Sequence, residues 1–351
     1  MIRMTAMKRL AICLLNISEG RNAKIVESVA SAAVSSSSAS QEMSSDDNKL
    51  GLKCQSTVLN IFSDYDYNRS VLTIAAPLHH LSQSVYNACR EAYRQVDMSK
   101  QCGGHPRLGA VDLLPIYPLS GDVSLEECGA LAREIASNLA RDVPGSSFFL
   151  FGSADHPNNT DLVARRRQVG WFFGNDEMDY STLKHDIGSK PSARYGLTGV
   201  GASLYVTNYN VTINTKDVSI GHDISKRIRS TTPGGLPGVR VMAFAHGGKV
   251  EIACNVEHFS NDKTKDVPYK TNEEKHKLDN QPHTSTYKDV CYTSPAAIEA
   301  RVKALAEEQG VTLEGSSVIG FTPQEAYELA VHALQTGKAE FWRTRKPGTM
   351  M

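Results

Sequence analysis

Apolar and polar residues alternate along the chain with two periods, one typical of helices and one typical of strands. Residues 22–34 carry apolar side chains at helical spacing, and residues 80–96 repeat that spacing. Ser124 and Glu127 have the spacing of a capping box and predict a helix that runs to about residue 142. Short apolar runs predict strands at residues 10–15, 57–62, 70–75, 110–116 and 147–151. Helices and strands in this order predict an α/β or α+β fold, with the helices packed on a sheet.

The second half of the chain repeats this alternation. Residues 203–213 are rich in Val, Thr and Tyr, which predicts a strand, and residues 239–257 predict a hairpin around Gly247 and Gly248. The other predicted elements are helices at 218–228, from Ser294 onward and from Thr322 onward, and a strand at 312–319. Strand, helix, two strands, helix and strand is the ferredoxin-like order. The 351 residues therefore predict two compact α/β units.

Two polar stretches interrupt these patterns. Residues 35–51 begin with a run of serines, and residues 260–289 are almost entirely polar. Neither stretch has enough apolar surface to offset the entropy that folding costs. We therefore expect both to be solvated insertions in surface loops.

Composition narrows the class of protein. Hydrophobic residues make up 40% of the chain and charged residues 22%, as in an ordinary globular protein. Lys plus Arg and Asp plus Glu both total 38, so no surplus of cations is present to attract nucleic acid. No stretch approaches the ~20 apolar residues that a membrane span needs. We therefore expect neither a nucleic-acid partner nor a membrane partner.

The cysteines give no sign of a metal site or of disulfides. They are odd in number and form no CxxC pair and no other metal-ligand spacing. Unpaired thiols are typical of a reducing compartment. The apolar run at 10–15 is too short for a targeting segment and continues into polar residues. The sequence therefore predicts a cytoplasmic protein with free thiols and no metal.

The candidate chemistry begins in the segment from Gln101 to Asp112. Glycines and a proline surround His105 and Arg107, just before a predicted strand. Glycine lets a backbone approach a ligand closely, and proline stiffens the loop. A histidine in such a loop can exchange protons near neutral pH. Taken alone, the segment is equally consistent with a structural loop histidine.

Two further loops carry cations. Arg69 is suited to bind a carboxylate through two hydrogen bonds, although an exposed turn with ordinary hydrogen bonds explains the same residues. Residues 188–196 form a glycine-bounded loop that contains Lys190 and Arg194 and lies between the two halves of the chain. Ligands often bind at such junctions. A flexible linker is the alternative interpretation of that loop.

Five segments, in this order, resemble the motifs of the glutamate formiminotransferase family. They are Asn16-Ile17-Ser18-Glu19-Gly20-Arg21, Asn68-Arg69-Ser70-Val71, Gly104 to Asp112, Gly196 to Ala202 with Asn208, and Gly315-Ser316 followed by Ile319 to Pro323. One such match is weak, but five in order are specific, and the resemblance covers roughly residues 9–335. The chain resembles the transferase half of formiminotransferase-cyclodeaminase, in a stand-alone, plant-like form.

The resemblance implies two subdomains of ferredoxin-like βαββαβ type, with helices on one face of each sheet and a folate groove between them. It implies an N-terminal subdomain at residues 1–198 with the insertion 35–51, a C-terminal subdomain at 199–336 with the insertion 260–289, and a tail at 337–351. It also implies a homodimer that acts on folate and formiminoglutamate, with tetrahydrofolate as the co-substrate.

The family's catalytic histidine falls on His105, which is expected to act as base and acid during formimino transfer. Asn68, Arg69 and Arg107 are the residues expected to bind the donor substrate. The loop expected to bind folate consists of Gly188, Ser189, Lys190, Pro191, Ser192, Ala193, Arg194, Tyr195 and Gly196. Its two cations are expected to attract the anionic tail of folate.

Two positions depart from the family's pattern. Many members have a glutamate immediately before the histidine and another after the Gly-Ser pair, where this chain has Gly104 and Ser317. These two changes affect the identity of the donor substrate more than the binding of folate. The leading hypothesis is transfer from N-formimino-L-glutamate to tetrahydrofolate. The alternatives are transfer between formylglutamate and 5-formyl-tetrahydrofolate, and a folate-binding protein with little or no transferase activity.

Overall fold

The computed structural model describes residues 9–38, 45–171, 179–260, 284–287 and 290–345. The chain divides into two compact units. The first comprises Met1–Ser203 and Glu325–Gly348, and the second comprises Leu204–Gln324 and Thr349–Met351. Both units combine helices with a sheet, which confirms the predicted α/β class. The predicted subdomain boundaries stay a prediction.

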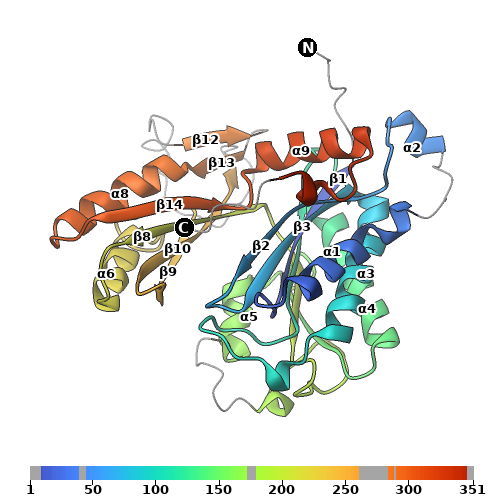
Figure 1. The fold of residues 1–351 in the computed structure, drawn as a ribbon, viewed down its shortest axis with the longest axis horizontal. Coiled ribbons are helices and arrows are strands. Elements are labelled where there is room, and N and C mark those ends of the chain that lie inside the picture. The colour runs from blue at the N-terminus through green and yellow to red at the C-terminus, as the bar shows by residue number, and fades with distance from the viewer. Residues whose placement is uncertain (1–8, 39–44, 172–178, 261–283, 288–289, 346–351) are drawn as a thin grey trace. The chain divides into compact units, whose positions relative to one another are not determined.

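The first unit begins with the element order that the sequence predicts. Its elements are β1 (Leu10–Ile17), α1 (Ala23–Ser38), β2 (Thr57–Asp64), β3 (Arg69–Pro77), α3 (Leu78–Gln95) and β4 (Val111–Pro118) (Figure 1). These strands pair antiparallel in the order β2-β3-β1-β4, which is the ferredoxin-like arrangement. The sheet continues beyond β4 with β7 (Thr198–Ala202), β5 (Ser147–Gly152) and β6 (Ile187–Gly188).

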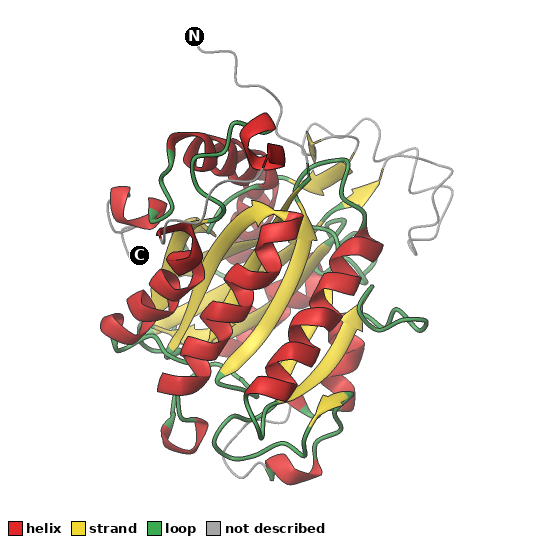
Figure 2. Cartoon of the chain, turned by 90° about the vertical axis from the view of Figure 1, so that its right-hand side faces the viewer, coloured by secondary structure: helices red, strands yellow, loops and turns green. Residues whose placement is uncertain are grey.

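One face of this seven-stranded sheet is covered by α1, α3 and α4 (Leu125–Asp142), which lie side by side (Figure 2). The strand residues that pack in the same core alternate with residues on the other face, and on β1 they include Cys13, Leu15 and Ile17. The face opposite these helices holds the candidate site described below.

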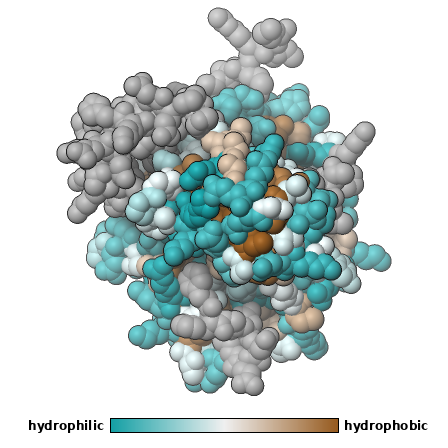
Figure 3. Space-filling view, turned by 90° about the vertical axis from the view of Figure 1, so that its left-hand side faces the viewer, coloured by the Kyte–Doolittle hydropathy of each residue, from teal (hydrophilic) through white to brown (hydrophobic). Residues whose placement is uncertain are grey.

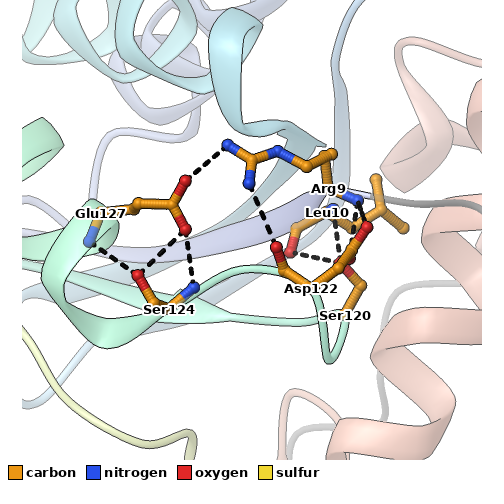
Figure 4. A network of polar contacts seen from close by, with 6 residues as sticks. All are labelled: Arg9, Leu10, Ser120, Asp122, Ser124 and Glu127. Atoms are coloured by element: carbon orange, nitrogen blue, oxygen red, sulfur yellow. Dashed lines mark hydrogen bonds and ion pairs between the residues drawn. The ribbon is translucent and has the colours of Figure 1, made fainter.

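The start of α4 confirms the predicted capping box. Ser124 Oγ accepts a hydrogen bond from the backbone N–H of Glu127 at 3.2 Å, and Glu127 Oε2 accepts one from the backbone N–H of Ser124 at 2.9 Å. Arg9 forms an ion pair with Glu127 at 2.7 Å and donates its backbone N–H to Asp122 (Figure 4). These contacts tie the residue before β1 to the loop that precedes α4.

The sequence pattern does not predict β7, because two glycines interrupt it. The strand lies between β4 and β5 and runs parallel to both. A Cβ atom at Gly201 would lie 2.5 Å from the carbonyl oxygen of Phe151 on the neighbouring strand. Gly201 therefore permits a close approach of two strands and does not mark a turn.

The second unit repeats the ferredoxin-like order. Its elements are β8 (Val206–Ile213), α6 (Val218–Ile228), β9 (Val239–His246), β10 (Lys249–Glu257), α8 (Pro295–Glu307) and β14 (Leu313–Ile319). The strands pair antiparallel in the order β14-β8-β10-β9. Gly247 and Gly248, with φ of 55° and 73°, form the predicted hairpin turn. Figure 3 views the side on which α6 and α8 lie in Figure 1, and the described residues there are mostly hydrophilic.

The prediction that residues 35–51 form a surface loop is wrong in part. Residues 35–38 continue α1, and α2 (Ser45–Lys49) follows, whereas residues 39–44 lie outside the described residues. Ser35 fits into the helix because its hydroxyl donates to the carbonyl oxygen of Ala32 at 2.9 Å. The helix thus extends one turn further than its apolar pattern indicates.

Most of the insertion predicted at 260–289 lies outside the described residues, which omit 261–283 and 288–289. Its ends belong to a small antiparallel sheet of β11 (Phe259–Ser260), β13 (Val290–Thr293) and β12 (Thr284–Tyr287). The other described elements are α5 (Leu162–Gln168), α9 (Pro323–Thr336) and 3-10 turns at Met98–Lys100, Tyr180–Thr182 and Phe341–Thr344.

Within the described part of the chain, no helix combines the length and the apolar character that a membrane crossing needs. All seven cysteines are free thiols, as the sequence predicts. Cys102 is exposed, and the others are buried.

Candidate active site

Strand alternation places polar side chains on the face of the first sheet that lies opposite the helices. On β1, Asn16 alternates with the core residues Leu15 and Ile17 and therefore points to the opposite face. Arg69, at the start of β3, lies on the same face by the same alternation. Asp112 joins them where the pairing of β4 with β1 becomes irregular.

The guanidinium of Arg69 connects these groups. Its Nη1 lies 2.9 Å from Asp112 Oδ2, in an ion pair whose side chains are 12% and 2% exposed. Asn16 Oδ1 accepts hydrogen bonds from Nη2 at 2.8 Å and from Nε at 3.2 Å. Nη1 also lies 3.0 Å from His105 Nδ1. One side chain thus links two strands to the loop that carries the histidine.

The imidazole of His105 is half-buried and oriented by its neighbours. Its Nδ1 lies 2.7 Å from the carbonyl oxygen of Pro106. A carbonyl oxygen only accepts, so this contact favours a proton on Nδ1 and a lone pair on Nε2. The rings of Tyr67 and Trp171 flank the imidazole, with centroids 5.3 and 5.8 Å from its own. Nε2 is therefore the nitrogen that can accept a proton.

Burial lowers the pKa of His105 well below its ordinary value. Three nearby positive charges lower it further, those of Arg69, Arg166 and Arg107, and the hydrogen bond with Pro106 acts in the opposite direction. The imidazole is therefore neutral at physiological pH. Neutral imidazole is the form that can act as a general base.

Asn68 holds the histidine loop from a second direction. Its side-chain oxygen accepts from the backbone N–H of Gly20 at 2.9 Å, and its amide nitrogen donates to the carbonyl oxygen of Cys102 at 3.0 Å and to Gln101. Its backbone has φ of 49°, a left-handed conformation that asparagine tolerates. Asn68 therefore positions the loop, and the substrate-binding role predicted for it stays a prediction.

Arg107 is buried, and its Nη1 donates to the carbonyl oxygen of Tyr67 at 3.0 Å. Burial lowers the pKa of its guanidinium. A Cβ atom at Gly103 would lie 2.3 Å from that Nη1, so glycine at this position makes room for the arginine. The guanidiniums of both Arg69 and Arg107 hold protein groups, and the substrate contacts predicted for them stay predictions.

Arg166 on α5 also faces this site. Its guanidinium carbon lies 4.3 Å from the centroid of the Trp171 ring. Burial lowers its pKa to about 10, although the negative charge of Asp112 opposes that shift. Among the residues that the structure describes, none forms a hydrogen bond or an ion pair with its side chain. A half-buried guanidinium of this kind is suited to bind a carboxylate.

The sequence does not single out Arg166, because it lies in a run of three arginines that is typical of a solvated helix face. The fold gives the three side chains different environments. Arg165 pairs with Asp186, Arg167 is exposed, and Arg166 lies over the ring of Trp171. The only signal in the sequence is a tryptophan five residues later, which is weak by itself.

The loop predicted to bind folate lies next to the histidine segment within the first unit. The backbone N–H of Leu197 donates to the carbonyl oxygen of Leu108 at 2.8 Å, and that of Ala110 donates to Tyr195 at 2.9 Å. Gly196 has φ of 69°, and a Cβ atom there would lie 1.9 Å from the carbonyl oxygen of Leu108. Glycine at 196 therefore allows the two segments to pair.

The two cations of this loop have different surroundings. Arg194 donates to the carbonyl oxygens of Tyr93 and Val96 and lies 3.7 Å from Asp97. It therefore stabilises the C-terminal end of α3, where positive charge is favourable. Lys190 is exposed and has no hydrogen bond or ion pair with any residue in the described ranges. Lys190 is thus the cation of the loop that can meet an anionic ligand.

Comparisons with known proteins agree with the resemblance found in the motifs. Residues 10–203 match the family described as the formiminotransferase domain, N-terminal subdomain. A formiminotransferase cyclodeaminase-like protein of Arabidopsis thaliana is 31% identical over 215 residues, which are 57% of this chain and 71% of that protein. A glutamate formimidoyltransferase of Streptococcus pyogenes is 28% identical over 65% of this chain and 70% of its own length. A formimidoyltransferase-cyclodeaminase of Gallus gallus is 24% identical over 91% of this chain and 51% of its own length.

Replacing Arg166 with glutamine should raise the pKa of His105, because a nearby positive charge is lost while the ring stays buried. An NMR titration of the histidine rings measures the shift, and the spectrum of His105→Ala identifies the resonance. Arg167→Gln is the matched control, since it removes the same charge from an exposed position on the same helix. Equal shifts in the two variants would contradict this electrostatic account.

The lowered pKa of His105 in the folded protein also sets how this residue affects the free energy of unfolding at different pH values. The histidine of the unfolded chain takes up a proton near pH ~6.5, whereas folded His105 does so only at a lower pH. His105 therefore reduces the free energy of unfolding as the pH falls below about 6.5, and it has no such effect at higher pH. The decrease in the free energy of unfolding at low pH should be smaller in Arg166→Gln, because the pKa of His105 lies closer to its ordinary value in that variant.

Proposed function

Because the chain belongs to the formiminotransferase domain family and is a transferase of one-carbon groups, we propose that it moves a formimino group from N-formimino-L-glutamate to tetrahydrofolate. The products are 5-formimino-tetrahydrofolate and glutamate. The observation that carries this proposal is the placement of His105, whose Nδ1 lies 2.7 Å from the carbonyl oxygen of Pro106 and 3.0 Å from Arg69, which leaves Nε2 as the nitrogen that accepts a proton.

The transfer requires two proton movements. N5 of tetrahydrofolate attacks the formimino carbon, a new carbon–nitrogen bond forms, and the carbon–nitrogen double bond opens to give a tetrahedral intermediate. Collapse of the intermediate re-forms the carbon–nitrogen double bond and breaks the bond between that carbon and the glutamate nitrogen, which departs with the bonding electrons. N5 loses a proton during attack, and the departing nitrogen gains one. Nε2 of His105 accepts the first proton and returns it to the glutamate nitrogen, so the enzyme ends the cycle unchanged.

The lowered pKa of His105 suits both movements. The imidazole is neutral before the reaction and is therefore ready to accept the proton from N5. The imidazolium that forms is a stronger acid than an ordinary one, which favours return of the proton to the departing nitrogen. The carbonyl oxygen of Pro106 accepts from Nδ1 and orients the ring, and Arg69, held by Asp112, lies against the same edge of the ring and limits its movement.

Arg166 is proposed to bind a carboxylate of the donor. Glutamate offers two carboxylates, and a guanidinium binds such a group through two parallel hydrogen bonds. Partial burial strengthens this attraction relative to bulk water. Arg166 and His105 both contact the ring of Trp171, which supports a donor whose carboxylate meets Arg166 while its formimino group lies near His105.

Folate is proposed to bind at residues 188–196. Two observations support this placement: the end of the loop pairs with the segment that follows His105, and Lys190 is exposed and can attract the anionic glutamyl tail. Arg194 contributes less to such a field, because it is engaged at the end of α3. The folate groove between subdomains and the homodimer stay predictions.

Transfer of a formyl group is the second candidate function, and Gly104 is the observation that favours it. A formimino group is an amidine and carries a positive charge at neutral pH, whereas a formyl group is neutral. The three arginines near the imidazole repel a cation, and no carboxylate at position 104 offsets them. A Cβ atom at Gly104 would make only ordinary contacts, the nearest at 3.6 Å from Asp66. The backbone can therefore accept a glutamate there.

The purified protein should form 5-formimino-tetrahydrofolate from tetrahydrofolate and formiminoglutamate, as measured by absorbance. His105→Ala should lose roughly 10²–10⁴-fold in rate, because proton transfer at both steps depends on the imidazole. His222→Ala, which removes an exposed histidine from α6, serves as the control and should retain the parent rate.

Each other result of this assay has a clear meaning. Turnover with formylglutamate alone would support the second candidate function. Tight folate binding without turnover of either donor would support a binding protein without transferase activity. Equal rates in the parent and His105→Ala would remove the histidine from the mechanism.

Gly104→Glu should favour the formimino donor, because its carboxylate attracts the cationic amidine. The ratio of kcat/KM for formiminoglutamate to that for formylglutamate should rise roughly fivefold, the size of one exposed charge pair. Gly104→Gln is the matched control, since it adds the same volume without the charge. A ratio that changes equally in the two variants would show that size, not charge, acts at this position.

A further inference from the structure

A second cluster of polar side chains lies in the first unit, apart from His105. It consists of Asp47 on α2 and of His79 and His80 in the first turn of α3. The Nε2 atoms of both imidazoles face one oxygen, Oδ1 of Asp47, at 3.2 Å for His79 and 2.8 Å for His80. Asp47 precedes His79 by 32 residues, so no spacing in the sequence reveals the cluster.

The convergence of two successive histidines is unusual for a helix. Adjacent side chains on a helix point roughly 100° apart, yet these ring centroids lie 4.0 Å from each other. The two nitrogens and the carboxylate oxygen all lie within 4.8 Å of one another. Ligand atoms around a tetrahedral zinc ion, with bonds of about 2.0–2.1 Å, lie roughly 3.3 Å apart. Small movements of these side chains would therefore give zinc geometry.

Burial and charge also favour a cation here. Asp47 is fully buried, and a buried carboxylate is costly unless positive charge compensates it. Oδ1 of this carboxylate faces the Nε2 atoms of both imidazoles, so a cation among the three groups would meet one negative charge and two ring nitrogens at once. Neutral imidazole is the form that coordinates metal ions.

We propose that Asp47, His79 and His80 bind a divalent transition-metal ion, and that Zn²⁺ is the ion best suited to them. Two imidazole nitrogens and one carboxylate oxygen form a donor set that zinc accepts, with water as a fourth ligand. The ligands come from α2 and α3, so the ion links the two helices. Arg69, which contacts His105, begins β3, whereas His79 and His80 follow the last residue of that strand, roughly 25 Å along it. The metal site is therefore separate from the proposed transfer chemistry.

The test uses the full chain, stripped of metal with a chelator and then titrated with Zn²⁺ in a calorimeter and with Co²⁺ in a spectrophotometer. The parent should bind one Zn²⁺ per chain, and Co²⁺ should give the visible bands of a tetrahedral site. Asp47→Asn and His80→Ala should each weaken Zn²⁺ binding at least tenfold. His222→Ala, an exposed histidine elsewhere, should bind as the parent does.

Because a change at the buried Asp47 can disturb folding, His79→Ala provides a second variant whose side chain is 49% exposed. It should keep the parent circular dichroism spectrum and lose Zn²⁺ affinity. Equal affinity in the parent and in His79→Ala and His80→Ala would overturn the proposal, as would a folded parent that binds no Zn²⁺. The rate of formimino transfer should not change when the ion is removed, which separates this test from that of the proposed function.

Discussion

The buried ion pair between Arg69 and Asp112 is the interaction on which the rest of the site depends. Buried charges are costly unless they are paired and hydrogen-bonded, and this guanidinium also donates to Asn16 and lies against His105. These groups come from β1, β3, β4 and the loop before β4. The pairing of the central strands therefore also fixes the position of the imidazole.

The same arrangement sets the electrostatics of the site. Asp112 is the carboxylate at the centre of three arginines, so positive charge is in excess around His105. That excess keeps the imidazole neutral and attracts carboxylates, which suits a donor derived from glutamate. The same excess of positive charge disfavours a cationic formimino group, and glycine at position 104 supplies no carboxylate to compensate it. The choice between the formimino and formyl donors therefore rests on local charge and not on the fold.

Features that depend on nearby residues could be predicted from the sequence, and features that depend on distant residues could not. The order of helices and strands follows from apolar periodicity, and the capping box at Ser124 is a local pattern. Gly201 permits a close approach of two strands, which depends on the adjacent strand. Arg194 caps a helix about 100 residues earlier in the chain. Arg166 differs from its neighbours only by its position over a ring. Asp47 meets its histidines only in the folded chain.

The kinetics of Asp112→Asn test the central claim most directly. Asparagine can still accept the hydrogen bond that Leu108 donates to Oδ1 at 2.8 Å, but it cannot pair with the charge of Arg69. If the ion pair orients His105, kcat for transfer should fall by roughly one to two orders of magnitude while KM for tetrahydrofolate stays the same. A correctly folded Asp112→Asn protein that turns over as fast as the parent would contradict the account.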